Sequence, residues 1–289
     1  MQLRRLGILG VGLLGGSIGL AVRSRLKDCV VVGYGHQGDT LRAARQMGAL
    51  DEAYEQPQQA VRDADLVVLC TPVGVLSPLL QQIAADVAGG AVVTDVGSTK
   101  RTVVQAGGRL LKPGVSFVGS HPMAGGEKRG VQFARADLFE GGICITTPTP
   151  QTDPAALARV EELWKLLGMR ITRLSPASHD RLLADVSHLP HAVAAALVGM
   201  QHEEALGLCG KGFLDLTRIA SGDPGLWRDI LLDNRDNVRQ SLRRMADQLQ
   251  RLEALLDGQN AESLRAWLDA AAARRQGLVD SKDQGPPAA

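Results

Sequence analysis

The chain has 289 residues, 45% of them hydrophobic and 22% charged, which is typical of a soluble globular protein of one or two domains. Its 32 basic and 31 acidic residues give a net charge of +1, which argues against a nucleic-acid-binding protein. The four cysteines are widely separated, so neither a metal site nor a disulfide framework is expected. No apolar stretch reaches about 18 uninterrupted residues. The first strand begins too early for a signal peptide to precede it. We therefore expect a cytoplasmic protein that does not cross a membrane.

The first half of the chain alternates short apolar runs with helical patterns. The predicted strands are 6–9, 30–32, 66–70, 91–94, 115–118, 143–146 and 169–174, and the predicted helices are 17–26, 41–47, 75–87, 99–111 and 154–167. Continuous apolar strands that alternate with helices indicate a parallel sheet covered on both faces.

After about residue 175 the pattern becomes almost entirely helical, with predicted helices at 181–206, 224–256 and 263–278. The expected fold class is therefore α/β. It has an N-terminal Rossmann dinucleotide-binding domain at 1–174 and an all-helical domain at 175–280. The polar, proline-rich residues 281–289 are predicted to be a disordered tail.

A glycine motif connects the first predicted strand to the first predicted helix. In this context Gly-x-Gly-x-x-Gly is the fingerprint of a dinucleotide-binding loop. Gly10 allows the tight turn, Gly12 allows the backbone to approach a pyrophosphate, and Gly15 allows the helix to pack close to the strand. Leu13 and Leu14 lie within this motif and are also expected to contact the cofactor, and the free amides at the start of the following helix attract phosphate.

The end of the second strand decides which nicotinamide dinucleotide is expected. NAD enzymes usually carry an acidic residue there, which binds the ribose hydroxyls, but this chain has Gly35. His36 and Gln37 follow, and both can donate hydrogen bonds to a 2′-phosphate. We therefore expect NADP in preference to NAD. The alternative is that the turn only exposes backbone and NAD still binds.

Two segments place chemically capable side chains at the predicted carboxyl edge of the sheet, where such folds bind ligands. Ser98 lies between a strand and a helix, so it is either a helix cap or a site residue. His121 follows another strand, in a loop rich in glycine and proline. An imidazole can accept a proton near neutral pH, so His121 is either structural or a catalytic base.

Two further segments lie in the helical half. His188 and His191 are spaced i, i+3, but no other ligand pattern completes a metal site, so none is expected. Arg218 stands in an apolar, small-residue stretch and is expected to be partly buried. Such an arginine needs an anionic partner, either an internal carboxylate or a substrate carboxylate.

Together these segments resemble the prephenate/arogenate dehydrogenase family of tyrosine biosynthesis. The matching segments occur in the family's order over residues 6–256, and are GVGLLGGS (10–17), CTPV (70–73), TDVGSTK (94–100), GSHPMAG (119–125), SHLPH (187–191), TRIA (217–220) and DPGLWRDI (223–230). HPMAG and SHLPH are specific in combination, whereas CTPV and the glycine loop occur in many Rossmann proteins.

The resemblance implies a reaction and a set of roles. A cyclohexadiene carrying a hydroxyl and a carboxylate would lose a hydride to the nicotinamide and carbon dioxide from the ring, which becomes aromatic. The resemblance implies that His121 and Ser98 are catalytic. It assigns substrate binding to Arg218, His191, His188 and Glu127, with Asp180 as a partner for Arg218. It adds Thr71, Pro72 and Val73 to the cofactor-binding residues.

The resemblance further implies that the helical domain forms a homodimer and that the partner molecule is a small substrate, prephenate or arogenate. Lys128, beside Glu127, would belong to the groups that gate or polarise the cleft. Two alternatives stay open. One is another two-domain Rossmann dehydrogenase of the β-hydroxyacid or imine type, and the other is a non-catalytic dinucleotide sensor.

Overall fold

A computed structural model describes residues 3–126 and 128–283 of the chain. The chain forms two compact units, residues 1–238 and residues 239–289. The first unit thus includes helices that the sequence assigned to a separate domain from residue 175, and that domain boundary stays a prediction. The predicted tail lies outside the described residues from 284 onward, and 281–283 continue the last helix.

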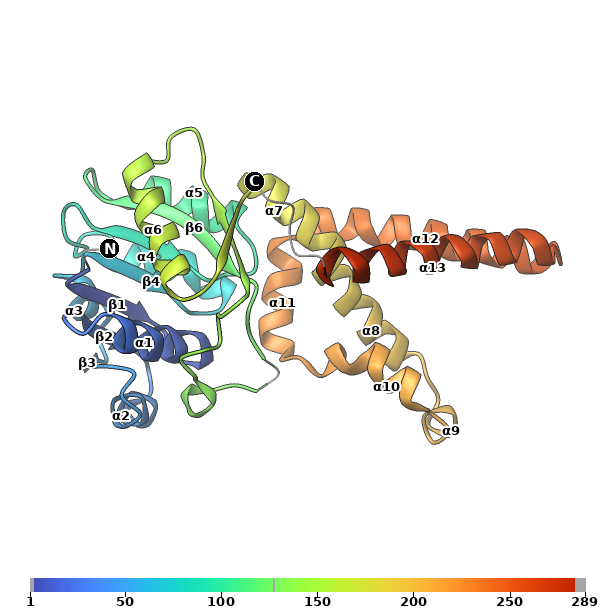
Figure 1. Ribbon diagram of the computed structural model, residues 1–289, viewed down its shortest axis with the longest axis horizontal. Coiled ribbons are helices and arrows are strands. Elements are labelled where there is room, and N and C mark those ends of the chain that lie inside the picture. The colour runs from blue at the N-terminus through green and yellow to red at the C-terminus, as the bar shows by residue number, and fades with distance from the viewer. Residues whose placement is uncertain (1–2, 127, 284–289) are drawn as a thin grey trace. The chain divides into compact units, whose positions relative to one another are not determined.

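The first unit is built on an eight-stranded sheet in the order β3-β2-β1-β4-β5-β6-β7-β8 (Figure 1). The strands are β1 Arg5–Leu9, β2 Val30–Tyr34, β3 Glu52–Tyr54, β4 Leu66–Leu69, β5 Val92–Asp95, β6 Ser116–Pro122, β7 Ile143–Thr147 and β8 Arg170–Arg173. Because β1 lies between β2 and β4, the winding of the sheet reverses at β1. Open α/β sheets bind their ligands at such a reversal, beyond the carboxyl ends of the strands.

The sequence predicted a parallel sheet. The structure differs at one pair of strands, because β7 runs antiparallel to β6. Between them the described residues hold only the short 3₁₀ helix η1, Val131–Phe133, and no crossover helix. A parallel return needs a longer crossover connection, usually a helix, so the chain turns back in the opposite direction. β8 is again parallel to β7, because the long helix α6 joins them.

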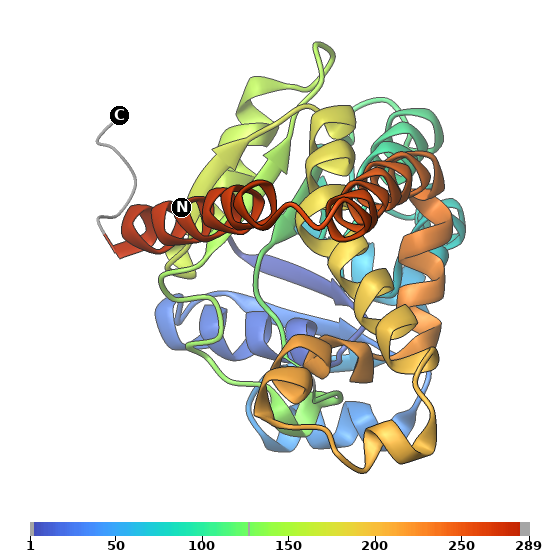
Figure 2. The ribbon, with the colours of Figure 1, turned by 90° about the vertical axis from the view of Figure 1, so that its right-hand side faces the viewer.

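Helices cover both faces of the sheet, as predicted. They are α1 Leu13–Arg25, α2 Gly38–Gln46, α3 Pro57–Val61, α4 Val73–Ile83, α5 Arg101–Leu110 and α6 Pro154–Leu166. Alternate residues of the buried strand β4 serve two cores: Leu66 and Val68 pack with α1 and α6, whereas Val67 and Leu69 pack with α4 and α5. Figure 2 shows α1 (blue) and α4 and α5 (teal) on opposite sides of the strands. A fully buried leucine or valine contributes roughly 2 kcal/mol, so such a strand anchors both layers.

The helical half is more interrupted than predicted. Its elements up to the second unit are α7 Pro176–Leu183, the π-helical turn η2 Ala184–His188, α8 Leu189–Gly199, α9 Glu203–Leu206, α10 Lys211–Thr217, the 3₁₀ turn η3 Arg218–Ser221, α11 Pro224–Asp233 and α12 Arg235–Asp257. The predicted helix 181–206 is wrong at 200–202, where α8 has ended and His202 precedes α9. The predicted helix 224–256 breaks at Asn234, whose side chain is buried in hydrogen bonds.

These helices belong to the first unit because they pack on the sheet domain. α7 contacts α5, and α11 contacts α4. Gly74, at the start of α4, makes room for α11, since a β-carbon there would lie 2.7 Å from a carboxylate oxygen of Asp229. The stretch Pro176–Gly199 is long and apolar enough to cross a membrane by length and composition alone, a test that core helices of globular proteins also pass.

The second unit consists of the rest of α12 and α13 Ala261–Asp283, which lie side by side (Figure 1). The connection contains Gln259 in the left-handed region, with a φ of 47°. Leu249, Leu256 and Leu268 are more than half exposed, so this unit carries apolar surface that its own two helices do not cover.

Candidate functional site

The glycine loop has the geometry that its sequence predicts. Gly10 has a φ of 106°, and a β-carbon there would lie 2.7 Å from the carbonyl oxygen of Cys70. A β-carbon on Gly15 would lie 2.1 Å from the carbonyl oxygen of Gly10, so the helix sits directly against the strand end. Gly12 differs, because nothing lies within 4 Å of its β-carbon position. The open space at Gly12 is where a pyrophosphate would approach the backbone.

The start of α1 adds two features that suit a phosphate. Gly12 is the N-cap and makes no side-chain hydrogen bond, and the first turn carries no acidic residue, so the helix amides stay available to an anion. Next to the loop, the Thr71 methyl lies 3.1 Å from the Gly10 β-carbon position, and its buried hydroxyl has no partner among the described residues. Pro72 and Val73 then lead into α4. The residues present therefore fit a dinucleotide.

The turn after β2 is formed by Gly35, His36 and Gln37. The Tyr34 hydroxyl lies 3.1 Å from Nδ1 of His36, which holds the exposed ring beside the strand end. One turn further on, Arg42 Nη1 lies 3.3 Å from the β-carbon position of Gly38. No arginine stands in the turn itself, but the second turn of α2 supplies Arg42, which is paired with Asp39.

His121 lies within β6, not in the loop after it as the sequence predicted. The strand continues to Pro122 because β7 pairs with it beyond the end of β5, and His121 is opposite Ile145. The sequence could not show this extension, because it comes from an antiparallel neighbour. His121 is still at the carboxyl edge of the sheet, and it is 9% exposed.

A relay of hydrogen bonds connects His121 to the helical half of the unit. Its Nδ1 lies 2.9 Å from Nε2 of His179, and Nδ1 of His179 lies 2.8 Å from a carboxylate oxygen of Asp180. His179 and Asp180 are fully buried in α7. An ionised carboxylate only accepts hydrogen bonds, so Nδ1 of His179 donates to Asp180. In the neutral ring Nε2 of His179 must then accept, so Nδ1 of His121 donates and its Nε2 keeps the lone pair.

The surroundings hold the relay in these protonation states. Burial lowers the pKa of His121 well below its ordinary value of 6.5, and repulsion by His179, Lys100 and His188 adds to the effect. Burial also lowers the pKa of His179, although the hydrogen bond to Asp180 opposes it. Burial works to raise the pKa of Asp180, but hydrogen bonds from His179 and two backbone amides outweigh it and keep the pKa below its ordinary value.

Ser98 does not cap α5. The N-cap is Lys100, and the amides of Lys100 and Arg101 donate instead to the two carboxylate oxygens of Asp180, at 2.7 and 3.0 Å. The half-buried Ser98 thus stays free of the capping role. Its backbone carbonyl faces His188, so it lies close to the histidines of the helical half.

The π-helical turn η2 precedes His191 and ends at His188. Single π-helical turns are frequent at functional sites. Burial lowers the pKa of His188 to about 4. Its Nδ1 lies 3.1 Å from Asn234 Nδ2, whereas its buried Nε2 has no partner among the described residues. His191 stacks on Trp227 with ring centroids 3.6 Å apart, and its buried Nδ1 is also unpartnered within that part of the chain. The buried Nδ1 of His191 is therefore available to a ligand, whereas the His188 ring faces the carbonyl of Ser98.

Arg218 begins η3, and its side chain is exposed in the single chain. The prediction that Arg218 is partly buried is therefore wrong for the single chain. The turn packs on α8, the helix that carries His191. Asp180, the partner expected for Arg218, directs its carboxylate to the α5 amides, the Arg101 side chain and His179. Lys128 lies over the ring of Phe133, 5.3 Å from its centroid. Glu127 lies outside the described residues.

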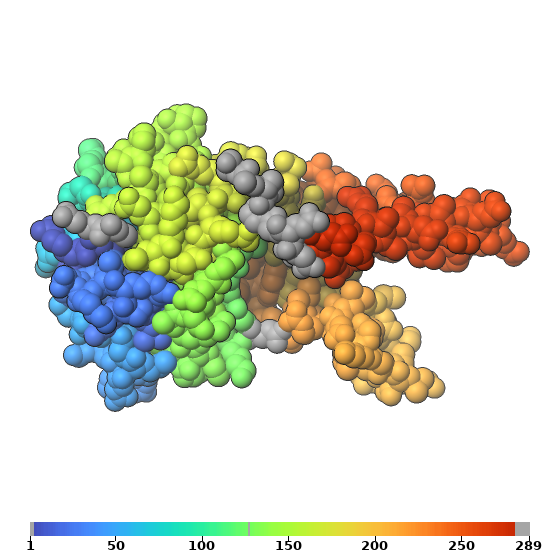
Figure 3. All heavy atoms as spheres, in the orientation of Figure 1, coloured from blue at the N-terminus to red at the C-terminus, as the bar shows by residue number. Residues whose placement is uncertain are grey.

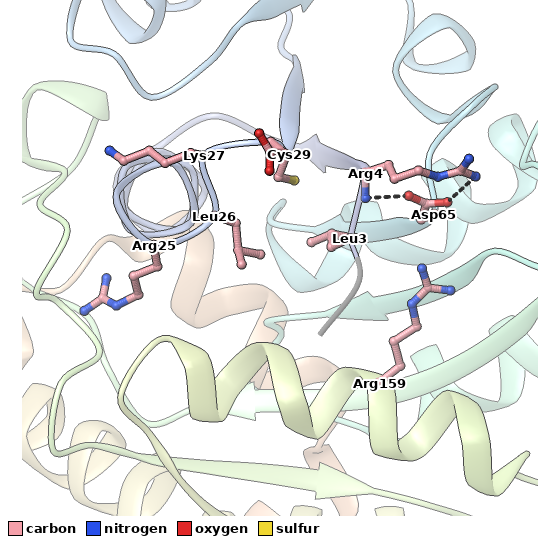
Figure 4. A pocket seen from close by; sticks show the side chains of 9 residues that line it. Leu3, Arg4, Arg25, Leu26, Lys27, Cys29, Asp65 and Arg159 are labelled. Carbon is pink, nitrogen blue, oxygen red and sulfur yellow. Dashed lines mark hydrogen bonds and ion pairs between the residues drawn. The ribbon is translucent and has the colours of Figure 1, made fainter.

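A hollow of about 670 Å³ in the first unit lies away from this edge of the sheet (Figure 4). It lies beside the start of β1, and its basic groups include Arg4, paired with Asp65, and Arg25, paired with Glu140. Ligands in this fold class bind beyond the carboxyl ends of the strands, so we do not assign the hollow to the candidate site. No group of metal-ligating side chains occurs within residues 3–126 and 128–283.

Several residues of the site were not predicted. His179 belongs to none of the matching segments, and Lys100 and Trp227 lie within two of them but had no predicted role. Two signals could have indicated Lys100 and His179: a lysine after a buried strand, and a histidine followed by an aspartate ahead of SHLPH. Their contacts depend on residues far away in sequence, which no local pattern reveals.

Comparison with known proteins gives this site a family context. Residues 18–173 match the model of the prephenate dehydrogenase nucleotide-binding domain, and residues 175–270 match that of the prephenate dehydrogenase dimerization domain. A prephenate dehydrogenase of Bacillus subtilis is 34% identical over 94% of this chain and 75% of its own length. A cyclohexadienyl dehydrogenase of Zymomonas mobilis is 32% identical over 90% of this chain and 91% of its own.

Solved structures agree with these matches. The prephenate dehydrogenase of Aquifex aeolicus, in complex with hydroxyphenyl propionate and NAD+, is 33% identical, with a TM-score of 0.90 over 96% of this chain and 99% of that one. The arogenate dehydrogenase of Synechocystis is 29% identical, with a TM-score of 0.83 over 95% and 99% of the two chains. A 3-hydroxyisobutyrate dehydrogenase of Salmonella typhimurium, at 14% identity and a TM-score of 0.56, shares the fold alone.

Proposed function

The chain belongs to the prephenate dehydrogenase family, and from this premise we propose that it oxidises and decarboxylates prephenate, arogenate or both in tyrosine biosynthesis. The observation that carries the proposal is the relay from Asp180 through His179 to His121 at the carboxyl edge of the sheet. It presents a neutral imidazole as a base beside the glycine loop's dinucleotide site. A sensor without catalysis has no use for such a base, and a β-hydroxyacid or imine enzyme leaves the histidines of the helical half unexplained.

In the proposed reaction the relay acts on the ring hydroxyl of the substrate. Nε2 of His121 accepts the hydroxyl proton, while the hydrogen bond from its Nδ1 to His179 fixes the ring and its tautomer. A bound nicotinamide would supply the hydride acceptor for the carbon that carries the hydroxyl. The bond from the ring to the carboxylate carbon then breaks, carbon dioxide leaves, and the electron pair completes the aromatic ring. The half-buried Ser98 lies near His188 and is proposed to orient the same hydroxyl.

We assign the substrate's other groups to the helical half. Arg218 is the anchor for a carboxylate, because its guanidinium is exposed and its turn packs on α8. His191, on α8, and His188, on the preceding turn η2, are proposed to bind other polar groups of the substrate. Glu127, outside the described residues, is retained as a substrate-side residue on the resemblance alone.

For the cofactor we propose NADP in preference to NAD. Position 35 carries no carboxylate that would repel a 2′-phosphate, and the neighbouring His36 and Gln37 are exposed donors. Arg42 adds a positive charge near Gly38, although Asp39 competes for it. Gly10, Gly12 and Gly15, with Leu13 and Leu14 at the start of α1, hold the pyrophosphate in the same proposal.

We also propose a homodimer in the cytoplasm. Several apolar side chains of the helical half are strongly exposed in the single chain, among them Val186 at 72%, Met200 at 70% and Leu208 at 85%. The part of the first unit formed by α9 and α10, light orange in Figure 3, projects from the rest of that unit. Apolar surface of this kind is typical of an obligate interface. Light scattering should therefore give twice the chain mass. The four free cysteines suit a reducing compartment.

A steady-state assay with both substrates and both cofactors tests the proposed function. The purified protein is mixed with prephenate or arogenate and with NAD or NADP, and reduced nicotinamide is followed by absorbance. We expect turnover of at least one substrate, with a higher kcat/KM for NADP than for NAD. Inactivity in all four mixtures, together with measurable dinucleotide binding, would favour the sensor.

A further inference from the structure

A buried ion pair that the proposed mechanism does not use lies directly behind the relay. Lys100 and Asp95 are both fully buried, and the lysine ammonium contacts a carboxylate oxygen of Asp95. Burying two charges costs several kcal/mol each in lost hydration, and an apolar pair of similar size is often as stable. The fold alone therefore does not require a charged pair at this place.

The pair is bonded to the residue that precedes His121. The Lys100 ammonium donates to the carbonyl oxygen of Ser120 at 2.8 Å, and the Ser120 amide donates to Asp95 at 3.2 Å. The Ser120 hydroxyl donates to the Asp95 carbonyl at 2.6 Å and accepts from Trp164 at 3.0 Å. The amide, carbonyl and hydroxyl of Ser120 all form hydrogen bonds, so the backbone just before His121 is fixed in place.

The same lysine also reaches the far end of the relay. Its backbone amide donates to Asp180 at 2.7 Å, on the oxygen that also accepts from His179. Lys100 therefore holds Ser120, the residue before His121, through its side chain, and it holds Asp180 through its backbone amide. A one-residue connection of this kind sets the distance between β6 and α7, across which the imidazoles must meet.

We propose that Lys100, paired with Asp95, is a positioning residue for the base: it locks Ser120 and Asp180 around the two histidines and places a fixed positive charge behind them. The catalytic role of Lys100 rests on the proposed function, whereas its contacts with Ser120 and Asp180 are independent of that function. The charge disfavours a second positive charge on His121, which therefore stays neutral and able to accept a proton.

The groups that act on His121 limit what else could have this effect. They are His179 of α7, His188 of η2 and Lys100, and the Cys144 thiol of β7 lies against its backbone. The carboxylates of Asp180 and Asp95 act on His179. Among the groups of the described residues that lower the pKa of His121 by repulsion, Lys100 is the one that is not a histidine. Removing its charge should therefore make His121 easier to protonate.

Three variants test this role. Lys100→Met removes the charge, Lys100→Arg keeps it, and Asp95→Asn/Lys100→Met replaces the whole pair by neutral side chains and so avoids an unpaired buried carboxylate. Lys165→Met, on the exposed side of α6, is the matched control. In both methionine variants we expect the acid limb of the kcat/KM profile to move up by about one pH unit and kcat to fall about tenfold. Lys100→Arg should keep the wild-type limb even where its kcat falls.

A titration independent of turnover separates this inference from the proposed function. The imidazole of His121 is followed by NMR in the substrate-free protein and identified by the loss of its signal in His121→Asn. We expect its midpoint to rise in the double neutral variant, at a melting temperature close to wild type, and to stay unchanged in Lys165→Met. An unchanged midpoint or acid limb in a folded charge-removed variant would overturn the role of Lys100. Failure of the four-mixture assay would overturn the reaction alone.

Discussion

The glycine loop occupies six consecutive residues, 10–15, whereas the relay joins His121 to His179 over 58 positions and Lys100 to Asp180 over 80. The first region works through backbone geometry: a positive φ at Gly10, open space at Gly12 and free amides at the start of α1. The second works through side chains whose protonation depends on burial and on one another. Cofactor binding is thus a local property of the chain, and proton transfer is a property of its tertiary packing.

If this contrast is correct, substitutions in the relay should change turnover and leave cofactor affinity alone. We expect His121→Asn to lower kcat by about 10³-fold, because asparagine has no basic nitrogen. The dissociation constant of the dinucleotide, from quenching of tryptophan fluorescence, should stay within about twofold of wild type. His202→Asn, at an exposed histidine, is the control. Turnover near wild type would remove His121 as the base.

The wild-type pH profile sharpens the same assignment. The base acts when neutral, so kcat/KM should hold as pH falls below 6.5, the ordinary value, and decline only through the lowered pKa of His121. A decline centred at or above 6.5 would contradict the effect of burial on this imidazole.

Arg218→Gln tests the substrate half at a residue outside the relay. Losing a guanidinium that grips a carboxylate should raise the KM for prephenate or arogenate about 100-fold, corresponding to a charge-assisted pair of about 3 kcal/mol. The KM for the dinucleotide should hardly move. Arg170→Gln, on the exposed edge strand β8, controls for loss of a surface charge. Equal increases in both KM values would argue against a carboxylate anchor.

His179→Gln breaks the relay without touching the base itself. We expect kcat to fall about tenfold, because Nδ1 of His121 loses the partner that fixes its tautomer. The acid limb should also rise, since His179 is one of the groups that lower the pKa of His121. His202→Gln is the matched change at an exposed histidine, and it should leave the acid limb in place. A profile unchanged by His179→Gln would show that the relay has no catalytic consequence.

The sequence predicted the fold where one element's signal is local. The buried strands β1, β4 and β5 are continuous apolar runs, and both sheet faces are covered as expected. The errors come from long-range pairing: β7 turned antiparallel, β6 grew to include His121, and Asn234 interrupted a helical pattern because its side chain bonds to α7. β3 and α3 are too short for a periodic pattern to show.

The candidate site divides in the same way. The glycine loop and the turn at Gly35 could be located from the sequence, because chain neighbours form them. The positions of His121, Ser98, His188 and His191 followed from motifs, but their connections did not. His179 and Lys100 were given no role from the sequence. Only the fold shows that α7 places His179 against His121 and Asp180 against the backbone amide of Lys100.

The smallest expected effect tests the weakest part of the cofactor half, at Gly35. Its backbone needs no positive φ, and a β-carbon would lie 3.3 Å from Leu41, so an aspartate fits after a shift of a few tenths of an ångström. Gly35→Asp would place a carboxylate where NAD enzymes bind the ribose hydroxyls and where a 2′-phosphate is repelled. We expect the ratio of kcat/KM for NADP to that for NAD to fall about tenfold, with kcat unchanged. Gly89→Asp, at an exposed glycine with free space around it, should leave the ratio as it is. If Gly35→Asp also leaves it unchanged, cofactor choice does not depend on this turn, and Arg42 and Glu55, which both lie near Gly38, become the positions to exchange next.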